Sequence, residues 1–267
     1  MGITIGRWQE KLVERLEERG IQTVFCPSGD FLLLKIPGSD QLVINLIPVV
    51  NNFYARDLIS LQQEYRLAGI QLIQLWEDIW LTRPEQVLSR ISGLLGKNKK
   101  IHGRKTVIST VTQPEADYFF NLYHLQGAAK SRNRYALSAD QEIVAIATFS
   151  AKRKMTRKRE GYTSVELIRF ATKDGITVQG GLSKLIKHLI RTILPDDVMT
   201  YADLDWSYGK GYAKLGFELT EQTPPLEICL DTQQMTRYFP HRLPEEIPAE
   251  NFIPIFNTGN LKYILYL

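Results

Sequence analysis

A small group of tyrosine and aspartate side chains in the C-terminal half has the chemistry to move protons. Tyr212 precedes Lys-Leu-Gly-Phe, and the glycine of that phrase, Gly216, is expected to end a short helix in a left-handed cap. A phenol, whose ordinary pKa is near 10, can protonate a departing thiolate. Tyr201 and Asp203 occupy alternate positions of a strand-like run and therefore face the same way. The alternative is that Tyr212 only packs a helix on a sheet, and that the aspartate marks a turn.

A glycine pair upstream of these residues indicates a phosphate-binding turn. The segment VQGGLSKLIKHLI, residues 178–190, follows the strand-like run VELIRFAT and opens a helix at Gly180 and Gly181. Backbone N–H groups at a helix N-terminus bind phosphate, and Ser183 and Lys184 lie within reach of such a group. The simpler interpretation is a turn whose glycines let a helix and a strand pack closely.

Taken together and in this order, the two segments resemble the N-acyltransferases of the GNAT type. In that superfamily an Arg/Gln-x-x-Gly-x-Gly/Ala turn holds the pyrophosphate of coenzyme A. Gly181 and Ser183 match the small positions here, but Val178 stands where the basic residue or glutamine is expected. The resemblance implies acetyl-CoA or another acyl donor, bound at Gly180, Gly181, Ser183 and Lys184, with Tyr212 as the acid. The departure at Val178 leaves the donor open.

A wider resemblance covers roughly residues 40–265. The chain is similar to phage homing-endonuclease-like proteins and, more distantly, to the Mom family of DNA-modification proteins. The residues that carry the resemblance are 124–127, 169–170, 180–184, 201–203, 206–207 and 209–217. Because Mom-type proteins modify the exocyclic amine of adenine, the resemblance implies a transferase that acts on an amine of nucleic acid, with a DNA nucleobase as the first expectation.

The same resemblance implies roles for individual side chains. Tyr201 and Asp203 would orient the amine and remove its proton, with His124 as a further base. The expected substrate contacts are Arg169, Trp206, Ser207 and Gln126. Three of these assignments have plainer alternatives. His124 suits a helix C-terminus and Trp206 suits a core. Arg169 lies on an apolar strand, where an unpaired charge is costly, so its partner could be Asp203 instead of a substrate.

The first hundred residues predict an α/β unit related to a nuclease fold. Their order of helix, three strands, helix, strand and helix, with stops at Gly20, Gly69 and Gly96, resembles the restriction-endonuclease-like domain of very-short-patch-repair proteins. An active nuclease of this class needs carboxylates that hold a divalent cation. Asn45 stands at the expected first position and no acid-x-Lys pair follows. We therefore predict a degenerate domain without nuclease activity or a metal, which could serve DNA docking or dimerisation. The alternative is a residual metal site at Asp40 with Glu77.

Positive charge is clustered although the formal net charge is only +4. The basic residues expected to contact nucleic acid are Lys99, Lys100 and Arg104 in one segment, and Lys152, Arg153, Lys154, Arg157, Lys158 and Arg159 in another. Two such clusters favour DNA as a partner, with solvated loop tips as the alternative.

The expected fold class is α/β, in the α+β sense, with two domains. Residues 1–100 form the degenerate nuclease-like domain, and residues 104–267 form a mixed-sheet acyltransferase-type domain with a C-terminal extension. The polar segment KNKKIHGRK is the expected boundary. In the second domain, strand, helix, antiparallel strands, glycine turn, helix, strand, helix and strand follow one another, and one strand is expected to run on to Trp206.

Composition limits the remaining possibilities. No run reaches the roughly 18 apolar residues of a membrane span, and the N-terminus has no signal-peptide core, so we expect a cytoplasmic protein without membrane contact. Cys26 and Cys229 have no metal-ligand spacing, which predicts neither a disulfide nor zinc. Alternatives to DNA modification are noncatalytic DNA binding and acyl transfer to a protein or to aminoacyl-tRNA. The sequence leaves the oligomeric state open, including a dimer.

Overall fold

The chain divides into two compact units that are each assembled from separate segments. The structure is a computed structural model that describes residues 5–156 and 158–267. The first unit comprises Met1–Pro84, Ala202–Tyr208 and Gln222–Leu261, and the second comprises Glu85–Tyr201, Gly209–Glu221 and Lys262–Leu267.

This division differs from the expected ranges 1–100 and 104–267 in two places. The basic segment expected as a linker contains strand β5 (Lys99–His102), which pairs in parallel with β11 (Ile176–Gln179) inside the second unit. The expected C-terminal extension supplies Ile228, Leu230 and Ile255 to the core of the first unit, where they pack with Trp76. The segment was predicted as a linker because of its charged and turn-forming residues, and a short exposed strand such as β5 has the same composition.

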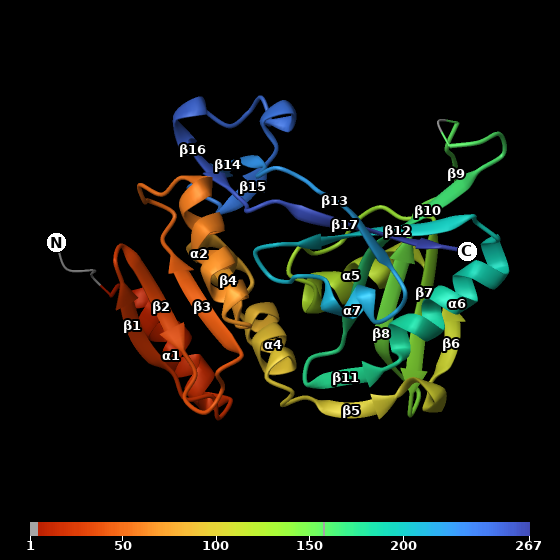
Figure 1. Ribbon diagram of the computed structural model, residues 1–267, viewed down its shortest axis with the longest axis horizontal. Coiled ribbons are helices and arrows are strands. Elements are labelled where there is room, and N and C mark those ends of the chain that lie inside the picture. Colours follow the sequence, from red (N-terminus) through yellow and green to blue (C-terminus); the bar gives the residue numbers. More distant parts are fainter. Residues whose placement is uncertain (1–4, 157) are drawn as a thin grey trace. The chain divides into compact units, whose positions relative to one another are not determined.

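The first unit is built on a four-stranded sheet in the order β1-β2-β3-β4 (Figure 1). Its β1, β2 and β3 are antiparallel neighbours, whereas β3 and β4 run parallel. A three-stranded sheet in the order β15-β14-β16 completes this unit. The elements are α1 (Arg7–Glu18), β1 (Val24–Ser28), β2 (Phe31–Lys35), β3 (Leu42–Ile47), α2 (Ala55–Leu67), β4 (Gln71–Trp76), α3 (Glu77–Thr82), β14 (Glu227–Asp231), β15 (Thr236–Tyr238), β16 (Phe252–Phe256) and the short 3-10 turns η2 (Pro240–Arg242) and η3 (Ala249–Asn251).

Glycine stops end both long helices of this unit as predicted. After α1, the N–H of Gly20 donates to Glu17 O and the N–H of Ile21 to Leu16 O. After α2, the N–H of Gly69 donates to Arg66 O and the N–H of Ile70 donates to Tyr65 O. Both glycines have positive φ, so each helix closes in a Schellman motif that a residue with a Cβ would strain.

The second unit is built around an eight-stranded mixed sheet in the order β13-β17-β12-β10-β8-β7-β6, with β9 added on β10. Its elements are α4 (Pro84–Leu94), η1 (Gly103–Lys105), β6 (Val107–Thr110), α5 (Gln113–Tyr123), β7 (Asn133–Ala139), β8 (Glu142–Phe149), β9 (Arg153–Lys154), β10 (Thr163–Thr172), α6 (Gly181–Ile193), β12 (Asp197–Asp203), α7 (Lys210–Ala213), β13 (Glu218–Gln222) and β17 (Asn260–Tyr266), the ends of α4, β12, β13 and β17 reaching into the first unit. The predicted α/β class with a mixed sheet is confirmed.

Helix α5 shows how the sequence covers this sheet. Ala116, Phe119 and Phe120 are buried on one face of α5 and pack on Ala136 and Ile146 of the sheet. Thr112 caps the helix by accepting from the N–H of Glu115. Strand β12, in contrast, ends at Asp203 and not at Trp206 as expected, because the chain turns there.

Two further expectations concern membranes and thiols. Within residues 5–156 and 158–267, no helix combines the length and apolar character needed to cross a bilayer. Cys26 and Cys229 are half-buried free thiols that lie in the first unit.

Candidate functional site

The turn between β11 and α6 offers backbone N–H groups at a helix N-terminus. Gly180 is the N-cap residue of α6 and has a left-handed φ of 71°. Gly181 is buried, and a Cβ built there would lie 2.8 Å from Val178 Cγ1. Within the described part of the chain, no side chain accepts a capping hydrogen bond from α6. The predicted glycine-opened helix is therefore confirmed. Uncapped N–H groups at a helix N-terminus suit an anionic ligand.

Lys184 does not point its charge at this turn. Its ammonium donates to the carbonyl oxygens of Gly103, at 3.0 Å, and of Thr106. Gly103 itself lies against the turn, since a Cβ built on it would meet Gln179 O at 3.0 Å. Lys184 thus fastens the 103–106 segment to α6. Ser183 is the remaining side chain that sequence analysis placed at this turn, and it is half-buried.

Strands β10 and β12 part in the middle of the sheet. They pair in parallel from Ser164 and Asp197 to Glu166 and Met199, and β10 is bulged against β8 just beyond this point. At the parting point, Thr200 Oγ1 donates to Leu167 O at 3.1 Å. Beyond it, the described residues of the two strands show no mutual backbone register. An opening between parallel strands leaves main-chain donors and acceptors for a ligand.

The opening and the glycine turn face the same edge of the sheet. In a connection between parallel strands, the helix runs back against the strand direction, so α6 begins towards the carboxyl ends of β10 and β12. Ligands of α/β sheets bind outside the carboxyl ends of strands. The arrangement can hold an elongated ligand with its anionic end at the turn and its amide groups between the strands.

Arg169 lies on β10 within the bulged stretch. Its Nη1 donates to Ile168 O at 2.9 Å and its Nε to Gly127 O at 3.3 Å. Burial lowers the pKa of Arg169, and the nearby charge of Glu166 opposes this effect. Among the described residues, no carboxylate lies within ion-pair distance of the guanidinium. A half-buried cation with only carbonyl partners suits an anionic group of a ligand.

His124 and Gln126 form a compact turn after α5. The Nδ1 atom of His124 accepts a hydrogen bond from the N–H of Gln126 at 3.1 Å. A neutral imidazole with an accepting Nδ1 carries its proton on Nε2. In this conformation Nδ1 is therefore engaged within the turn, and the general-base role expected for His124 stays a prediction. Gln126 is exposed.

Tyr212 has the local structure that the Lys-Leu-Gly-Phe phrase predicts. The N–H of Phe217 donates to Tyr212 O and that of Gly216 to Ala213 O, and Gly216 has a φ of 88°. The Tyr212 ring lies 5.6 Å from the ring of Phe217 and 5.7 Å from that of Tyr263. Its hydroxyl makes no hydrogen bond to another described residue, which leaves it open to a ligand.

The other residues proposed around the acceptor amine belong to different units. Tyr201 is 42% exposed and ends the β12 portion of the second unit. Asp203, Trp206 and Ser207 belong to the first unit, where Trp206 is buried. The plainer alternative for Trp206, a place in a core, is the one found.

Asp205 is a buried carboxyl of the same segment. Its Oδ1 accepts from both the backbone N–H and the Oγ1 of Thr258, at 2.9 and 2.7 Å. Burial and the neighbouring charge of Asp203 raise the pKa of Asp205 to about 7, against the lowering effect of these hydrogen bonds. Asp205 therefore pins residues 202–208 to the strand connection at Thr258.

The strand expected to carry a nuclease carboxylate carries a neutral amide pair. Asn45 of β3 lies opposite Gln74 of β4, and Asn45 Nδ2 donates to Gln74 Oε1 at 2.8 Å. Both are fully buried. Across residues 5–156 and 158–267, no group of three or more His, Cys, Asp or Glu side chains is placed to hold a metal ion.

The adjacent acids Glu77 and Asp78 begin helix α3. Glu77 accepts from the N–H of Val49 at 3.0 Å. Asp78 is 1% exposed and forms a bidentate pair with Arg237, at 2.6 and 2.8 Å. The partner lies far along the chain, so no local signal in the sequence pointed to this pair.

Much of the second basic cluster is bound within the molecule. Lys152 donates to the carbonyl of Ile193 at the end of α6. Lys158 contacts Asp197 and the hydroxyl of Tyr162, and Arg159 contacts Asp196. Arg153 lies 3.9 Å from Glu166, Lys154 is exposed, and Arg157 lies outside the described residues. These contacts fasten the loop to its own sheet and leave less charge for DNA than the composition indicated.

The first basic cluster, in contrast, is exposed beside the glycine turn. Lys99 and Lys100 of β5 and Arg104 of η1 are exposed. Because His102 at the end of β5 lies opposite Gln179 at the end of β11, the cluster runs alongside the start of α6. Its charge therefore adds to the positive end of the helix.

Comparisons with known proteins find likeness at the level of solved structures. A GNAT family acetyltransferase from Elizabethkingia anophelis with acetyl-CoA bound is similar over 61% of this chain and 99% of its own, at 16% identity and a TM-score of 0.37. The ribosomal-protein-S18-alanine N-acetyltransferase from Escherichia coli is similar over 60% and 93%, at 12% identity and a TM-score of 0.38. At such scores the likeness carries no conclusion about this chain. No protein-family model and no curated protein matches it.

Proposed function

We propose that the second unit is an acyltransferase that moves an acyl group from a coenzyme A thioester to an amine. The observation that carries the proposal is the parting of β10 and β12 after Glu166 and Met199, at the sheet edge where α6 begins at an uncapped glycine turn. A coenzyme A arm contains amides and a pyrophosphate, which are the groups that this opening and this turn suit.

The donor would be held mainly by backbone atoms. The N–H groups at Gly181 and Ser183 suit the pyrophosphate. The Lys184 ammonium is already engaged by carbonyl oxygens, so the backbone would supply most of the contacts. Exposed Lys100 and Arg104 supply long-range positive charge at the same place. This explains how the chain dispenses with a basic residue at Val178, which is buried. The proposed donor is therefore acetyl-CoA or another acyl-CoA.

In the transfer, the amine nitrogen forms a bond to the acyl carbon and the carbon–sulfur bond breaks. Tyr212, whose hydroxyl is free of partners among the described residues, would give its proton to the leaving thiolate. Arg169 would bind an anionic part of the substrate, and His124 stays a proposal for a further base. Tyr201 and Asp203 stay proposals for orienting the amine and accepting its proton.

The proposed acceptor is the exocyclic amine of a DNA nucleobase. Support comes from the resemblance to Mom-type proteins and from the exposed cluster at Lys99, Lys100 and Arg104. Transfer to a protein or to aminoacyl-tRNA, and noncatalytic DNA binding, are the other outcomes that an assay has to separate.

The test is an incubation of the purified protein with acetyl-CoA and duplex DNA, followed by mass analysis of the nucleosides. We expect a new acyl adduct whose rate of formation falls about 100-fold or more in Tyr212→Phe. Tyr118→Phe is the matched control, because Tyr118 is a 71% exposed tyrosine on α5.

A separate calorimetric titration with coenzyme A distinguishes a wrong donor from a wrong acceptor. Binding of coenzyme A without a DNA adduct would overturn the acceptor and keep the transferase, and peptides or aminoacyl-tRNA would be tested next. Absence of coenzyme A binding would overturn the donor. Salt-sensitive DNA binding alone would then support the noncatalytic alternative.

A further inference from the structure

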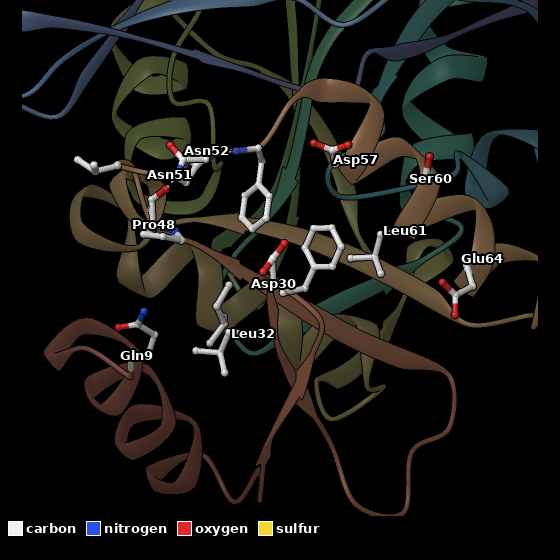
Figure 2. A pocket seen from close by; sticks show the side chains of 14 residues that line it. Gln9, Asp30, Leu32, Pro48, Asn51, Asn52, Asp57, Ser60, Leu61 and Glu64 are labelled. Carbon is white, nitrogen blue, oxygen red and sulfur yellow. Dashed lines mark hydrogen bonds between the residues drawn. The ribbon is translucent and has the colours of Figure 1, made fainter. Parts of the chain in front are cut away.

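The first unit contains a cavity that the transferase proposal does not use. Its volume is about 770 Å³, in the range of small-molecule pockets. Pro48 and residues 50–53, helix α2, the start of β2 and Gln9 of α1 line it. Figure 2 shows Asp30 in the middle of the view, with Asp57, Ser60 and Glu64 along α2 on one side and Gln9 on the other.

The charge of this cavity is of one sign. Asp30, Asp57 and Glu64 line it, and within the described part of the chain no Lys, Arg or His does. Asp57 is already engaged, since it accepts from the N–H of Tyr54 at 2.8 Å and lies 3.7 Å from Arg56. Asp30 and Glu64 are exposed, and their carboxylates have no hydrogen-bond or ion-pair partner among the described residues. Two uncompensated carboxylates therefore face the same space.

The wall between these acids is apolar and aromatic. Phe31 and Phe53 stack with ring centroids 5.0 Å apart and planes inclined by 18°. Buried Leu32 and Leu61 line the cavity beside them. Ring faces attract cations, and aliphatic side chains accommodate the methylene stem of a long amine.

Gln9 adds a polar group that aims at the same cavity. It is 5% exposed, and its Oε1 accepts from the N–H of Gly6 at 3.0 Å. Its Nε2 donates to no other described residue, although a buried amide donor ordinarily has a partner. A ligand with an accepting oxygen would satisfy it.

We infer that this cavity binds an alkyl guanidinium or ammonium group carried next to a carbonyl oxygen, as in an arginine or lysine residue. The cation would lie against Asp30 and Glu64, the stem on Phe31 and Phe53, and the carbonyl oxygen at Gln9 Nε2. Phosphodiesters do not fit, because the lining carboxylates repel them. The first unit then binds basic groups and is not the DNA-docking module that the sequence indicated.

The test uses the whole chain and three small probes in calorimetric titrations. Nα-acetyl-arginine amide has every proposed feature, Nα-acetyl-citrulline amide is its neutral counterpart, and agmatine lacks the carbonyl oxygen. We expect saturable binding of the first and at least tenfold weaker binding of the second. Equal binding of the arginine and citrulline compounds, or no binding of any probe at millimolar concentration, would overturn the inference.

Variants keep the result tied to this cavity. Asp30→Asn combined with Glu64→Gln should weaken the arginine probe at least tenfold without lowering the melting temperature, because neither carboxylate has a partner to lose. Glu10→Gln combined with Glu14→Gln changes the net charge equally at exposed positions of α1 and should bind like the original chain. Equal binding by both double variants would place the probe elsewhere and refute the site.

The probes also separate the two sources of such a group. Agmatine binding as tightly as the acetylated amide would point to a free amine and remove the role of Gln9. Tenfold tighter binding of a short arginine-containing peptide than of the single residue would point to a protein partner. The cation-binding part of the site stands in either case, whereas equal binding of agmatine overturns the part assigned to Gln9. Failure of the whole site would leave the acyltransferase proposal untouched.

Discussion

Asp205 and Asp78 are two buried carboxyls of the first unit that depend on different partners. Asp78 is neutralised by the guanidinium of Arg237, whereas Asp205 has hydrogen bonds from Thr258 and the charge of Asp203 nearby. The first is held as an ion pair. The second is held most firmly when it is protonated.

The pH dependence of stability follows from the raised pKa of Asp205. The pKa is about 7 in the folded chain and near 4 when unfolded, so the folded state holds the proton more tightly between these values. The stabilisation is complete below pH 4 and is lost as the pH rises through 7, by roughly 4 kcal/mol at most. Urea unfolding at several pH values should show this fall in the original chain and not in Asp205→Asn. The same slope in both proteins would refute the assignment.

The Asp78 pair predicts a large loss when one partner is removed. Arg237→Ala leaves a carboxylate that is 1% exposed without its cation, and such a change costs about 3–5 kcal/mol. Arg242→Ala, at an exposed position of η2, should change the free energy of unfolding by less than about 0.5 kcal/mol. Denaturant unfolding at pH 7 compares the two, and similar small losses would contradict the buried pair.

At the residue scale, sequence reasoning succeeded where chemistry is local. The absence of a carboxylate at Asn45 and the phenol at Tyr212 are visible in the chain itself. The engagement of Lys184 by Gly103, or of Asp78 by Arg237, depends on residues distant in sequence. The charge of Lys184 beside the glycine turn therefore led to a prediction of ligand contact, although in the fold this charge binds the carbonyl oxygen of Gly103.

The connection from β12 to α7 depends on one glycine at the element scale. Gly209 is the N-cap of α7, with a φ of 67°. A Cβ built on it would lie 2.3 Å from the ring of Tyr263, which is buried in β17. The helix that carries Tyr212 is thus positioned by contact between a bare backbone and an aromatic ring.

Two alanine substitutions in this short element should act in opposite directions. Gly209→Ala combines left-handed strain with a collision and should destabilise by about 2–4 kcal/mol. Gly211→Ala, in the helix itself with no atom within 4 Å of the new Cβ, should stabilise by roughly 0.5–1 kcal/mol. Thermal unfolding of both variants checks this, and a harmless Gly209→Ala would mean that Tyr263 does not pack there.

Element prediction worked best where a glycine marks an end. Gly20, Gly69 and Gly216 end their helices as predicted, because left-handed closure has a strong residue preference. The strand β5 was not predicted, since Lys99 and Lys100 are exposed and the strand it pairs with, β11, lies far along the chain. Pairing of that kind leaves no periodicity to detect.

At the scale of the whole molecule, the order of segments along the chain differs from the order of the units. The core around Trp76, Ile47 and Leu58 is completed by Ile228 and Ile255. Single-sequence patterns group residues by proximity in the chain, so this exchange could not be predicted. The mixed α/β class could be, because it depends only on the succession of elements.

The shared core predicts that the N-terminal segment does not fold alone. A fragment of residues 1–84 lacks the apolar residues of β14 and β16 and should lack cooperative unfolding by circular dichroism. Adding residues 222–261 through a linker should restore part of the transition. A cooperative transition in the short fragment would show that residues 222–261 are dispensable.

The distribution of the first unit over three chain segments also determines the order in which its parts are synthesised. Most of its sheet leaves the ribosome first, yet its last core strands are made only after nearly the whole second unit. The nascent chain must carry an unfinished apolar surface through most of translation. Production of this protein should therefore respond to chaperone supply and to slow elongation in ways that a protein with consecutive domains would not.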